Sequence, residues 1–272
     1  MFRDRFLVTI ILGPLGLFLV YLGGWFYFLP IAAILVLAAV EYSRLTQKLN
    51  WRVPIRLLLP IVVALWLTTI PELVGLDVNA TAYIPHLLLI GMVATLVYAL
   101  WLYEKQPAEK ALSSWAALVL GIMLLGWLGS HFFRLRAMGD MAVQWTAIAL
   151  LASWSADGAA FLVGRSIGRH KLAPRLSPKK TVEGYIGGIV FGTLITAIAA
   201  TILGMDTIPV IILSFVISTI TPAGDLGISL LKREADVKDS GQFLPGHGGA
   251  LDRVDTVLWS VTIAFYLIPL LT

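Results

Sequence analysis

Cysteine is absent from the 272 residues, which excludes disulfide bonds, thiolate catalysis and cysteine zinc sites. Charged residues are also scarce, at 13% of the chain, whereas hydrophobic residues make up 58%. This composition is too apolar for a soluble globular protein and too poor in charge for a disordered one. We therefore expect an all-α, polytopic membrane protein that forms one membrane-embedded domain.

About nine hydrophobic segments are long enough to be interpreted as membrane-spanning helices. The first two share the nearly uncharged stretch 6–40, which is too long for one crossing and is expected to break at Gly23-Gly24. The others are 57–70, 84–103, 114–133, 143–163, 185–203, 208–231 and 256–271. The segment 57–70 is short and is flanked by prolines, which makes it the weakest of the set.

The distribution of cations predicts the orientation. With nine crossings and a cytoplasmic N-terminus, every Lys and Arg except Arg134 and Arg136 falls in a cytoplasmic segment, as the positive-inside rule requires. Arg3 and Arg5 precede an apolar stretch without a small-residue cleavage site, so we expect a retained anchor there. The polar loops of the second half then face the cytoplasm.

The two halves of the sequence differ in their polar content. Residues 1–140 have few ionisable groups inside their apolar segments and no recognisable motif, which favours scaffold helices in contact with lipid. Residues 141–272 contain four polar clusters between or within apolar segments. Because charge near hydrocarbon is costly, we expect these clusters to form one catalytic site.

The first of these clusters lies within segment 208–231. Asp225, Ser229 and Lys232 stand at i, i+4 and i+7, so that a helix would place them on one face. Asp225 could then pair with Lys232 and hold helices together. It could instead bind Mg²⁺, an ion commonly held by one or two carboxylates together with substrate phosphates.

A second cluster precedes the last apolar segment. Asp252 and Asp255 are expected at i and i+3 in the first turn of a helix, where they could complement the helix dipole or hold a metal ion. Gly248 and Gly249 would offer backbone N–H groups to a phosphate. His247 is expected to donate or accept a hydrogen bond rather than carry protons, and it lacks the second ligand of a zinc site. No P-loop motif is present.

The loop 164–183 is rich in cations, which topology alone could explain. However, Ser177 and Pro178 fit the N-cap and first position of a helix, which would order the loop and direct Lys179 and Lys180 toward phosphates. Two turns before Arg165, Asp157 either pairs with that guanidinium or enters the site.

Gly184, Gly188 and Gly192 are spaced four residues apart. The first lies directly before segment 185–203, and the other two lie within it. Small residues at this spacing predict a close-packed helix face. We favour packing within the chain over a dimer interface.

Taken in order, these motifs resemble those of the phosphatidate cytidylyltransferase family, also called CDP-diglyceride synthases. The matching residues are Asp157 to Phe161 with Gly164-Arg165, Ser177 to Gly184, Ser229 to Arg233, Lys238-Asp239, Pro245 to Gly249 and Asp252 to Asp255. Many fixed spacings make a chance match improbable. The chain departs from the family at Ile228, where relatives commonly have glutamate, and at Ala250, where a larger aliphatic residue is expected.

The resemblance implies a nucleotidyltransferase that converts CTP and phosphatidate to CDP-diacylglycerol and pyrophosphate for phospholipid synthesis. It implies Mg²⁺, alone or with a second cation, bound by Asp225 and Asp252, with Asp255 as a further ligand. The substrate-binding residues would be Ser177, Lys179, Lys180, Ser229, Lys232, Arg233, His247, Gly248 and Gly249, with Lys238, Asp239 and Arg253 in the catalytic group. We expect a bacterial plasma membrane, a cytoplasmic active site and no nucleic-acid partner, and the sequence leaves both a homodimer and a single chain open.

Two other functions remain open from the residues. A CTP-dependent lipid-alcohol kinase would transfer the γ-phosphate to a hydroxyl, and it would need a base to deprotonate that hydroxyl. A transporter of phosphorylated metabolites would use Asp157 and Asp225 as coupling residues and would show inverted repeats in the two halves. The lack of polar motifs in residues 1–140 speaks against transport.

Overall fold

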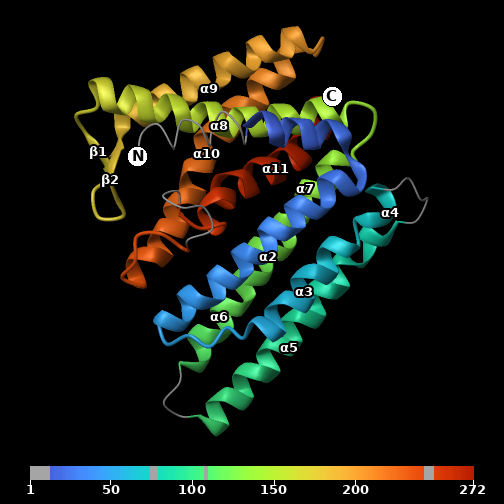
Figure 1. The fold of residues 1–272 in the computed structure, drawn as a ribbon, viewed down its shortest axis with the longest axis vertical. Coiled ribbons are helices and arrows are strands. Elements are labelled where there is room, and N and C mark those ends of the chain that lie inside the picture. Colours follow the sequence, from blue (N-terminus) through green and yellow to red (C-terminus); the bar gives the residue numbers. More distant parts are fainter. Residues whose placement is uncertain (1–12, 74–78, 107–109, 242–247) are drawn as a thin grey trace. The chain divides into compact units, whose positions relative to one another are not determined.

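The computed structural model describes residues 13–73, 79–106, 110–241 and 248–272 (Figure 1). The expected anchor with Arg3 and Arg5, and His247, lie outside these residues. The chain divides into two compact units. Unit 1 contains the described residues up to Ala137 together with Leu231–Val254, and unit 2 contains Met138–Leu230 and Asp255–Thr272. Residues 231–241 and 248–254, which the sequence places with the C-terminal half, therefore belong to the first unit.

Helices dominate both units. After an unlabelled helix at Gly13–Leu22, the elements up to residue 136 are α2 (Gly24–Lys48), α3 (Ile55–Leu67), α4 (Ile70–Leu73), η1 (Ala80–Tyr83), α5 (Ile84–Lys105), α6 (Ala111–Gly121), η2 (Ile122–Leu128) and α7 (Gly129–Arg136). They are followed by α8 (Ala142–Ile167), β1 (Lys171–Ala173), β2 (Ser177–Thr181), α9 (Val182–Ile202), α10 (Thr207–Glu234) and α11 (Leu251–Leu271). Helices α10 and α11 each contribute residues to both units.

Within the described residues, seven helices are long and apolar enough to cross a membrane. They are α2, η1 with α5, α6 through α7, α8, α9, α10 and α11. Two further apolar helices, Gly13–Leu22 and Ile55–Leu67, are shorter. The protein is therefore a nearly all-α integral membrane protein, as the composition indicates, and the count of nine crossings stays a prediction.

The expected break at Gly23-Gly24 is confirmed. Gly23 and Gly24 have φ of 64° and 49°, in the left-handed region that glycine adopts without strain. Beside the break, the Arg136 side chain donates from Nε to the Val20 carbonyl oxygen at 2.6 Å. A side chain on Gly23 would collide with this guanidinium. The cation thus occupies the carbonyl end of the first helix, where positive charge is favourable.

The predicted segment 114–133 is a continuous helical run from α6 to α7 with a π-helix, η2, in its middle. A π-helix widens the backbone spiral and shifts its hydrogen bonds. Trp66 of α3 donates its indole N–H to the Leu125 carbonyl oxygen at 2.9 Å. Gly126 and Gly129 lie against Leu65 and Trp66, which lets α3 approach this widened turn closely.

In unit 2, the glycine face of α9 packs against α8 along the two helices (Figure 1). A Cβ on Gly184 would lie 2.6 Å from the Ala160 carbonyl oxygen, and one on Gly188 would lie 2.8 Å from that of Ala156. Gly192 approaches both Ala156 and Ser218 of α10. The expectation of packing within the chain is confirmed, and this face is not free for a second copy.

The assignment of Ser177 and Pro178 to a helix start is wrong. Ser177–Thr181 forms strand β2, which pairs with β1 in an antiparallel hairpin. The residue that caps α9 is Thr181, whose hydroxyl accepts the Gly184 N–H at 3.1 Å. Proline is tolerated here because a two-stranded hairpin leaves each strand with an unpaired edge.

Helix α11 begins at Leu251, five residues before the apolar segment predicted by hydrophobicity. Hydrophobicity marks the apolar core of a helix, whereas backbone hydrogen bonds continue into the polar residues beside it. Asp252 lies in the first turn as expected. Asp255 lies one turn later and is buried, which corrects its expected place in the first turn.

The glycine face predicts a test of the α8–α9 contact. Gly188→Ala would push a methyl group against the α8 backbone, and overpacking of this kind costs about 1–3 kcal/mol. We expect a clearly lower melting temperature of the detergent-purified protein. Gly158→Ala on α8 meets no atom within 4 Å and is the matched control, expected to melt with or slightly above the wild type. Equal melting of Gly188→Ala and wild type would contradict the packing.

Candidate active site

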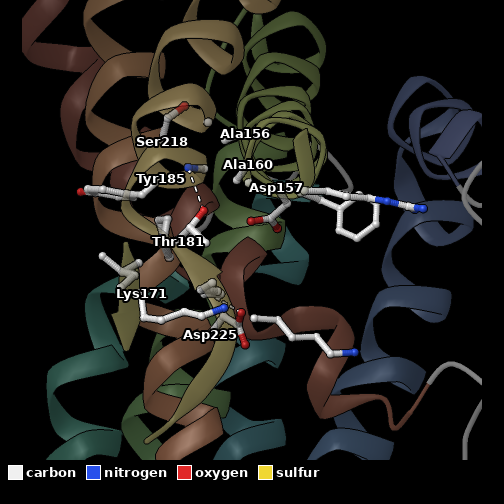
Figure 2. Close-up of a pocket in the computed structure, with 17 residues that line it drawn as sticks. Ala156, Asp157, Ala160, Lys171, Thr181, Tyr185, Ser218 and Asp225 are labelled. Atoms are coloured by element: carbon white, nitrogen blue, oxygen red, sulfur yellow. Dashed lines mark hydrogen bonds and ion pairs between the residues drawn. The ribbon is translucent and has the colours of Figure 1, made fainter. Parts of the chain in front are cut away.

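A pocket of about 490 Å³ lies in unit 2 between α8, the β1–β2 hairpin, α9 and α10 (Figure 2). Its charged lining consists of Asp157, Arg165, Lys171, Lys179, Lys180 and Asp225. Its apolar lining includes Phe161, Leu172 and Pro222. A cavity with cations at some of its walls and hydrocarbon at others suits an amphiphilic anion.

Asp225 is held by two partners in this pocket. Lys180 of β2 places Nζ 2.6 Å from Asp225 Oδ2, and the Ser229 hydroxyl donates to Oδ1 at 3.3 Å. The contact with Ser229 confirms that residues i and i+4 share a face. The sequence offered an ion pair between Asp225 and Lys232 as one alternative. The structure instead pairs Asp225 with Lys180 of the hairpin and Lys232 with Asp252.

Asp157 lines the same pocket, and its carboxyl group faces the cavity as that of Asp225 does (Figure 2). The Thr256 hydroxyl of α11 donates to Asp157 Oδ2 at 3.3 Å. The structure places Asp157 in the pocket lining, and its participation in a catalytic site stays a prediction. Arg165 is a separate member of the lining.

The hairpin that carries Lys179 and Lys180 is fixed at its base by Glu183. The Glu183 carboxylate accepts the N–H groups of Arg169 at 3.0 Å and His170 at 3.2 Å, and His170 Nδ1 lies 2.6 Å from Glu183 Oε1. A carboxylate in the first turn of α9 also complements the helix dipole. The loop is therefore ordered, as expected, but by strand pairing and Glu183 rather than by a helix start at Ser177.

A second polar cluster, the Asp252 cluster, lies in unit 1 at the start of α11. Lys232 places Nζ 2.5 Å from Asp252 Oδ1. Asp252 Oδ2 accepts the backbone N–H groups of Ser240 at 2.9 Å and Gly249 at 3.1 Å, and lies 3.0 Å from the Ser240 hydroxyl. Both side chains of the ion pair are nearly buried, with exposed fractions of 10% and 12%.

The backbone N–H groups at the start of α11 already have partners. Gly249 donates to Asp252, and the next two residues, Ala250 and Leu251, donate to Glu41 at 3.0 and 2.9 Å. The Gly249 N–H is therefore not free in this structure, and its contact with a phosphate would require an exchange of partners. Phosphate-binding roles for Gly248 and Gly249 stay predictions.

The sequence analysis missed Glu41, which accepts hydrogen bonds from residues next to Asp252. The apolar stretch 6–40 ends one residue before it, so hydrophobicity assigns Glu41 to a polar loop with Arg44 and Lys48. Helix α2 continues to Lys48 and carries Glu41 inside unit 1, where its exposed fraction is 7%. The sequence did contain a signal, which is a single carboxylate directly after the apolar residues Ala38, Ala39 and Val40. A carboxylate at the end of an apolar helix needs hydrogen-bond donors from elsewhere in the protein, so its position indicated a buried contact.

The remaining expected residues are divided between the two units. Ser177, Lys179, Lys180, Asp225, Ser229 and Asp255 belong to unit 2, whereas Lys232, Arg233, Lys238, Asp239, Gly248, Gly249, Asp252 and Arg253 belong to unit 1. Arg233, Lys238, Asp239 and Arg253 are exposed, and Arg233 donates to the Val237 carbonyl oxygen at 3.0 Å. Ile228 and Ala250, the two departures from the family pattern, are buried, which fits a packing role for both.

The carboxylates at Asp225 and Asp252 fit Mg²⁺ better than they fit a metal ion whose ligands all come from protein side chains. Within the residues that the structure describes, no group of three or more His, Asp or Glu side chains is arranged to hold a metal ion. Mg²⁺ needs only one or two carboxylates when phosphates and water complete its shell. Asp225 in the pocket and Asp252 at the start of α11 each offer one carboxylate beside a lysine.

The chain belongs to the cytidylyltransferase family, whose pattern it matches over residues 3–271. It is thus a nucleotidyltransferase. It is similar to proteins named phosphatidate cytidylyltransferase. That of Haemophilus influenzae is 33% identical over 98% of each chain, and that of Synechocystis is 29% identical over 98% of this chain and 97% of the relative. That of Bacillus subtilis is 37% identical over 56% of this chain and 58% of the relative.

The Lys232–Asp252 contact predicts a coupling between the two residues. Lys232→Met leaves a nearly buried carboxylate without its cation, which typically costs about 3–5 kcal/mol. We expect a large drop in the melting temperature of the ligand-free protein. Lys232→Met combined with Asp252→Asn removes both charges but keeps an oxygen for Gly249, so the double variant should melt above Lys232→Met. A double variant that melts as low as the sum of the single effects would show that the pair is not coupled.

Proposed function

We propose that this protein is a phosphatidate cytidylyltransferase, which transfers CMP from CTP to phosphatidate and releases pyrophosphate. The supporting observation is the ordered set of polar motifs from Asp157 to Asp255, in a chain similar over nearly its full length to proteins of that name. The product would be CDP-diacylglycerol for phospholipid synthesis. The comparisons do not favour a lipid-alcohol kinase or a transporter.

The reaction is a displacement at the α-phosphorus of CTP. A phosphate oxygen of phosphatidate forms a bond to this phosphorus, and the bond from the α-phosphorus to the bridging oxygen of the β-phosphate breaks. That oxygen leaves with pyrophosphate and carries the electron pair. The attacking phosphate is anionic at neutral pH, so that positioning and charge compensation are needed more than a strong base. A site rich in cations meets this requirement.

Asp225 and Asp252 would bind Mg²⁺, as the family resemblance implies, and Asp255 is a third candidate ligand. When bound, the ion balances the negative charge that phosphates bring to the site. Lys232, Arg233, Lys238 and Arg253 would bind the nucleotide and the leaving pyrophosphate. In the free protein, Lys180 and Lys232 each neutralise one of the two aspartates, and so hold them in place before ligands arrive.

The pocket in unit 2 would receive the phosphate of phosphatidate. Lys179 and Lys180 stand on the ordered hairpin, and Lys171 of β1 lines the same cavity. Phe161 and Leu172 supply apolar contacts for the adjoining part of the lipid. Ser177, at the start of β2, would support the same strand, and Ser229 would orient Asp225.

The proposal includes nine crossings, a cytoplasmic N-terminus and an active site facing the cytoplasm in a bacterial plasma membrane. Seven long helices and two shorter apolar helices among the described residues are compatible with this number. The concentration of Lys and Arg in alternate loops supports the orientation. CTP would reach the site from the cytosol, and phosphatidate from the bilayer. A homodimer remains part of the proposal.

Two substitutions test the reaction and the metal ligands together. The purified protein with labelled CTP, phosphatidate and Mg²⁺ should form CDP-lipid and pyrophosphate, whereas a kinase would form CDP and a lipid phosphate. Asp225→Asn and Asp252→Asn should each lower kcat by about a hundredfold or more, the scale of one lost electrostatic group. Asp206→Asn is the control, because Asp206 directly precedes the first residue of α10 and lies many residues from Asp225 along the helix. This variant should keep normal turnover. Turnover retained in both site variants would refute the metal assignment.

Lys179 tests the assignment of the pocket to the lipid. Lys179→Met should raise the KM for phosphatidate by about tenfold, the loss expected for one hydrogen bond to a charged group, with little change in the KM for CTP. Arg175→Met lies in the turn of the same hairpin, outside the pocket lining, and should leave both constants unchanged. If the KM for CTP rose instead, the pocket would belong to the nucleotide.

A further inference from the structure

Glu41 is a buried carboxylate whose oxygens are engaged by the segment around Asp252. Oε1 accepts the Ala250 N–H at 3.0 Å, and Oε2 accepts the Leu251 N–H at 2.9 Å and the Ser240 hydroxyl at 2.8 Å. The side chain comes from α2, about 200 residues earlier in the chain. Three donors fix both oxygens, so that this carboxylate has one orientation.

Glu41 and Asp252 hold the same short stretch of chain from two sides. Ser240 donates its backbone N–H to Asp252 and lies with its hydroxyl between the two carboxylates, 2.8 Å from Glu41 and 3.0 Å from Asp252. Gly249 donates to Asp252, while the next residue, Ala250, donates to Glu41. The residues that donate to Asp252 are therefore the same as, or directly next to, those that donate to Glu41.

The glycines of this segment leave the space that Glu41 fills. A Cβ on Gly241 would meet Glu41 atoms before any others, and a Cβ on Gly249 would meet both Glu41 and Ser240. Each approach is closer than real side-chain carbons tolerate. These contacts explain, without reference to a ligand, why glycine stands at both positions. Gly248 adds a φ of 83°, which glycine adopts readily.

We propose that Glu41 is a positioning residue for Asp252. It acts by holding residues 240–241 and 249–251 so that the Asp252 carboxylate keeps one orientation. This inference rests on the proposed function, in which Asp252 binds Mg²⁺. Partners that orient a metal ligand typically change metal affinity about 10- to 100-fold when they are lost.

The test compares Glu41→Gln with Ser43→Ala, a matched variant on the same helix. Glutamine keeps the size of the side chain but replaces one oxygen with an NH₂ group, which cannot accept a hydrogen bond. Either the Ala250 N–H or the Leu251 N–H therefore loses its acceptor, whichever way the amide is oriented. Ser43 is buried and donates to the Val53 carbonyl oxygen, away from Asp252. Binding of a fluorescent CTP analogue is measured without lipid as Mg²⁺ is raised, beside the melting temperature and CDP-lipid formation.

We expect Glu41→Gln to raise the Mg²⁺ concentration for half-maximal nucleotide binding about tenfold or more. Ser43→Ala should lower the melting temperature. It should leave the Mg²⁺ concentration for half-maximal nucleotide binding within about twofold of the wild type, because substitutions at independent sites change each other's effects by no more than this. If Glu41→Gln yields no folded protein, Ser240→Ala replaces it, because it deletes only the shared hydroxyl, and the same direction of change is expected.

A second pair of substitutions tests the geometry directly. Glu41→Asp shortens the side chain by one methylene, and Gly241→Ala fills the space next to it. Each should raise the Mg²⁺ requirement, and the double variant should raise it less than the product of the two effects. A wild type that forms CDP-lipid beside a folded Glu41→Gln with an unchanged Mg²⁺ requirement would overturn the positioning role alone. A wild type that binds no CTP and forms no CDP-lipid would overturn the proposed function as well.

Discussion

The contact between Glu41 and the first amides of α11 supports the structure around Asp252. A carboxylate in an apolar helix needs donors that replace water, and the first amides of any helix need acceptors. In this protein each requirement is met by the other, since Ala250 and Leu251 donate to Glu41. Asp252 then takes the neighbouring amides of Gly249 and Ser240, and Lys232 balances its charge. The glycines at 241 and 249 follow from the space that this arrangement requires.

The two polar clusters share one electrostatic design. In each, an aspartate expected to bind Mg²⁺ is paired with a lysine expected to bind phosphate, Asp225 with Lys180 in unit 2 and Asp252 with Lys232 in unit 1. Breaking the nearly buried Lys232–Asp252 pair by removal of one partner is costly. A nucleotide that arrives with its cation offers a new partner to both members of such a pair. On the proposed function, binding can therefore exchange partners at each aspartate without leaving a charge unpaired.

Sequence reasoning succeeded where a local pattern determines the structure. The break at Gly23-Gly24, the packing face of Gly184, Gly188 and Gly192, and the shared face of Asp225 and Ser229 all follow from spacing along one helix. It failed where a partner comes from a distant segment. Thr181 rather than Ser177 caps α9 because strand pairing with β1 takes precedence over the Ser-Pro signal. Glu41 was missed because hydrophobicity cannot reveal donors that lie 199 to 210 residues further along the chain.

That separation also sets an order of events during biosynthesis. Helix α2 leaves the ribosome long before Ser240 and Leu251 are made, and at ordinary translation speeds the delay over 199 residues is roughly 10 to 40 s. For this period the Glu41 carboxylate has none of its three final donors. The nascent chain must keep this part of α2 hydrated, protonated or shielded by the insertion machinery until the final helix arrives. Completion of unit 1 therefore waits for the synthesis of Ser240, Ala250 and Leu251, although most of its residues are synthesised much earlier.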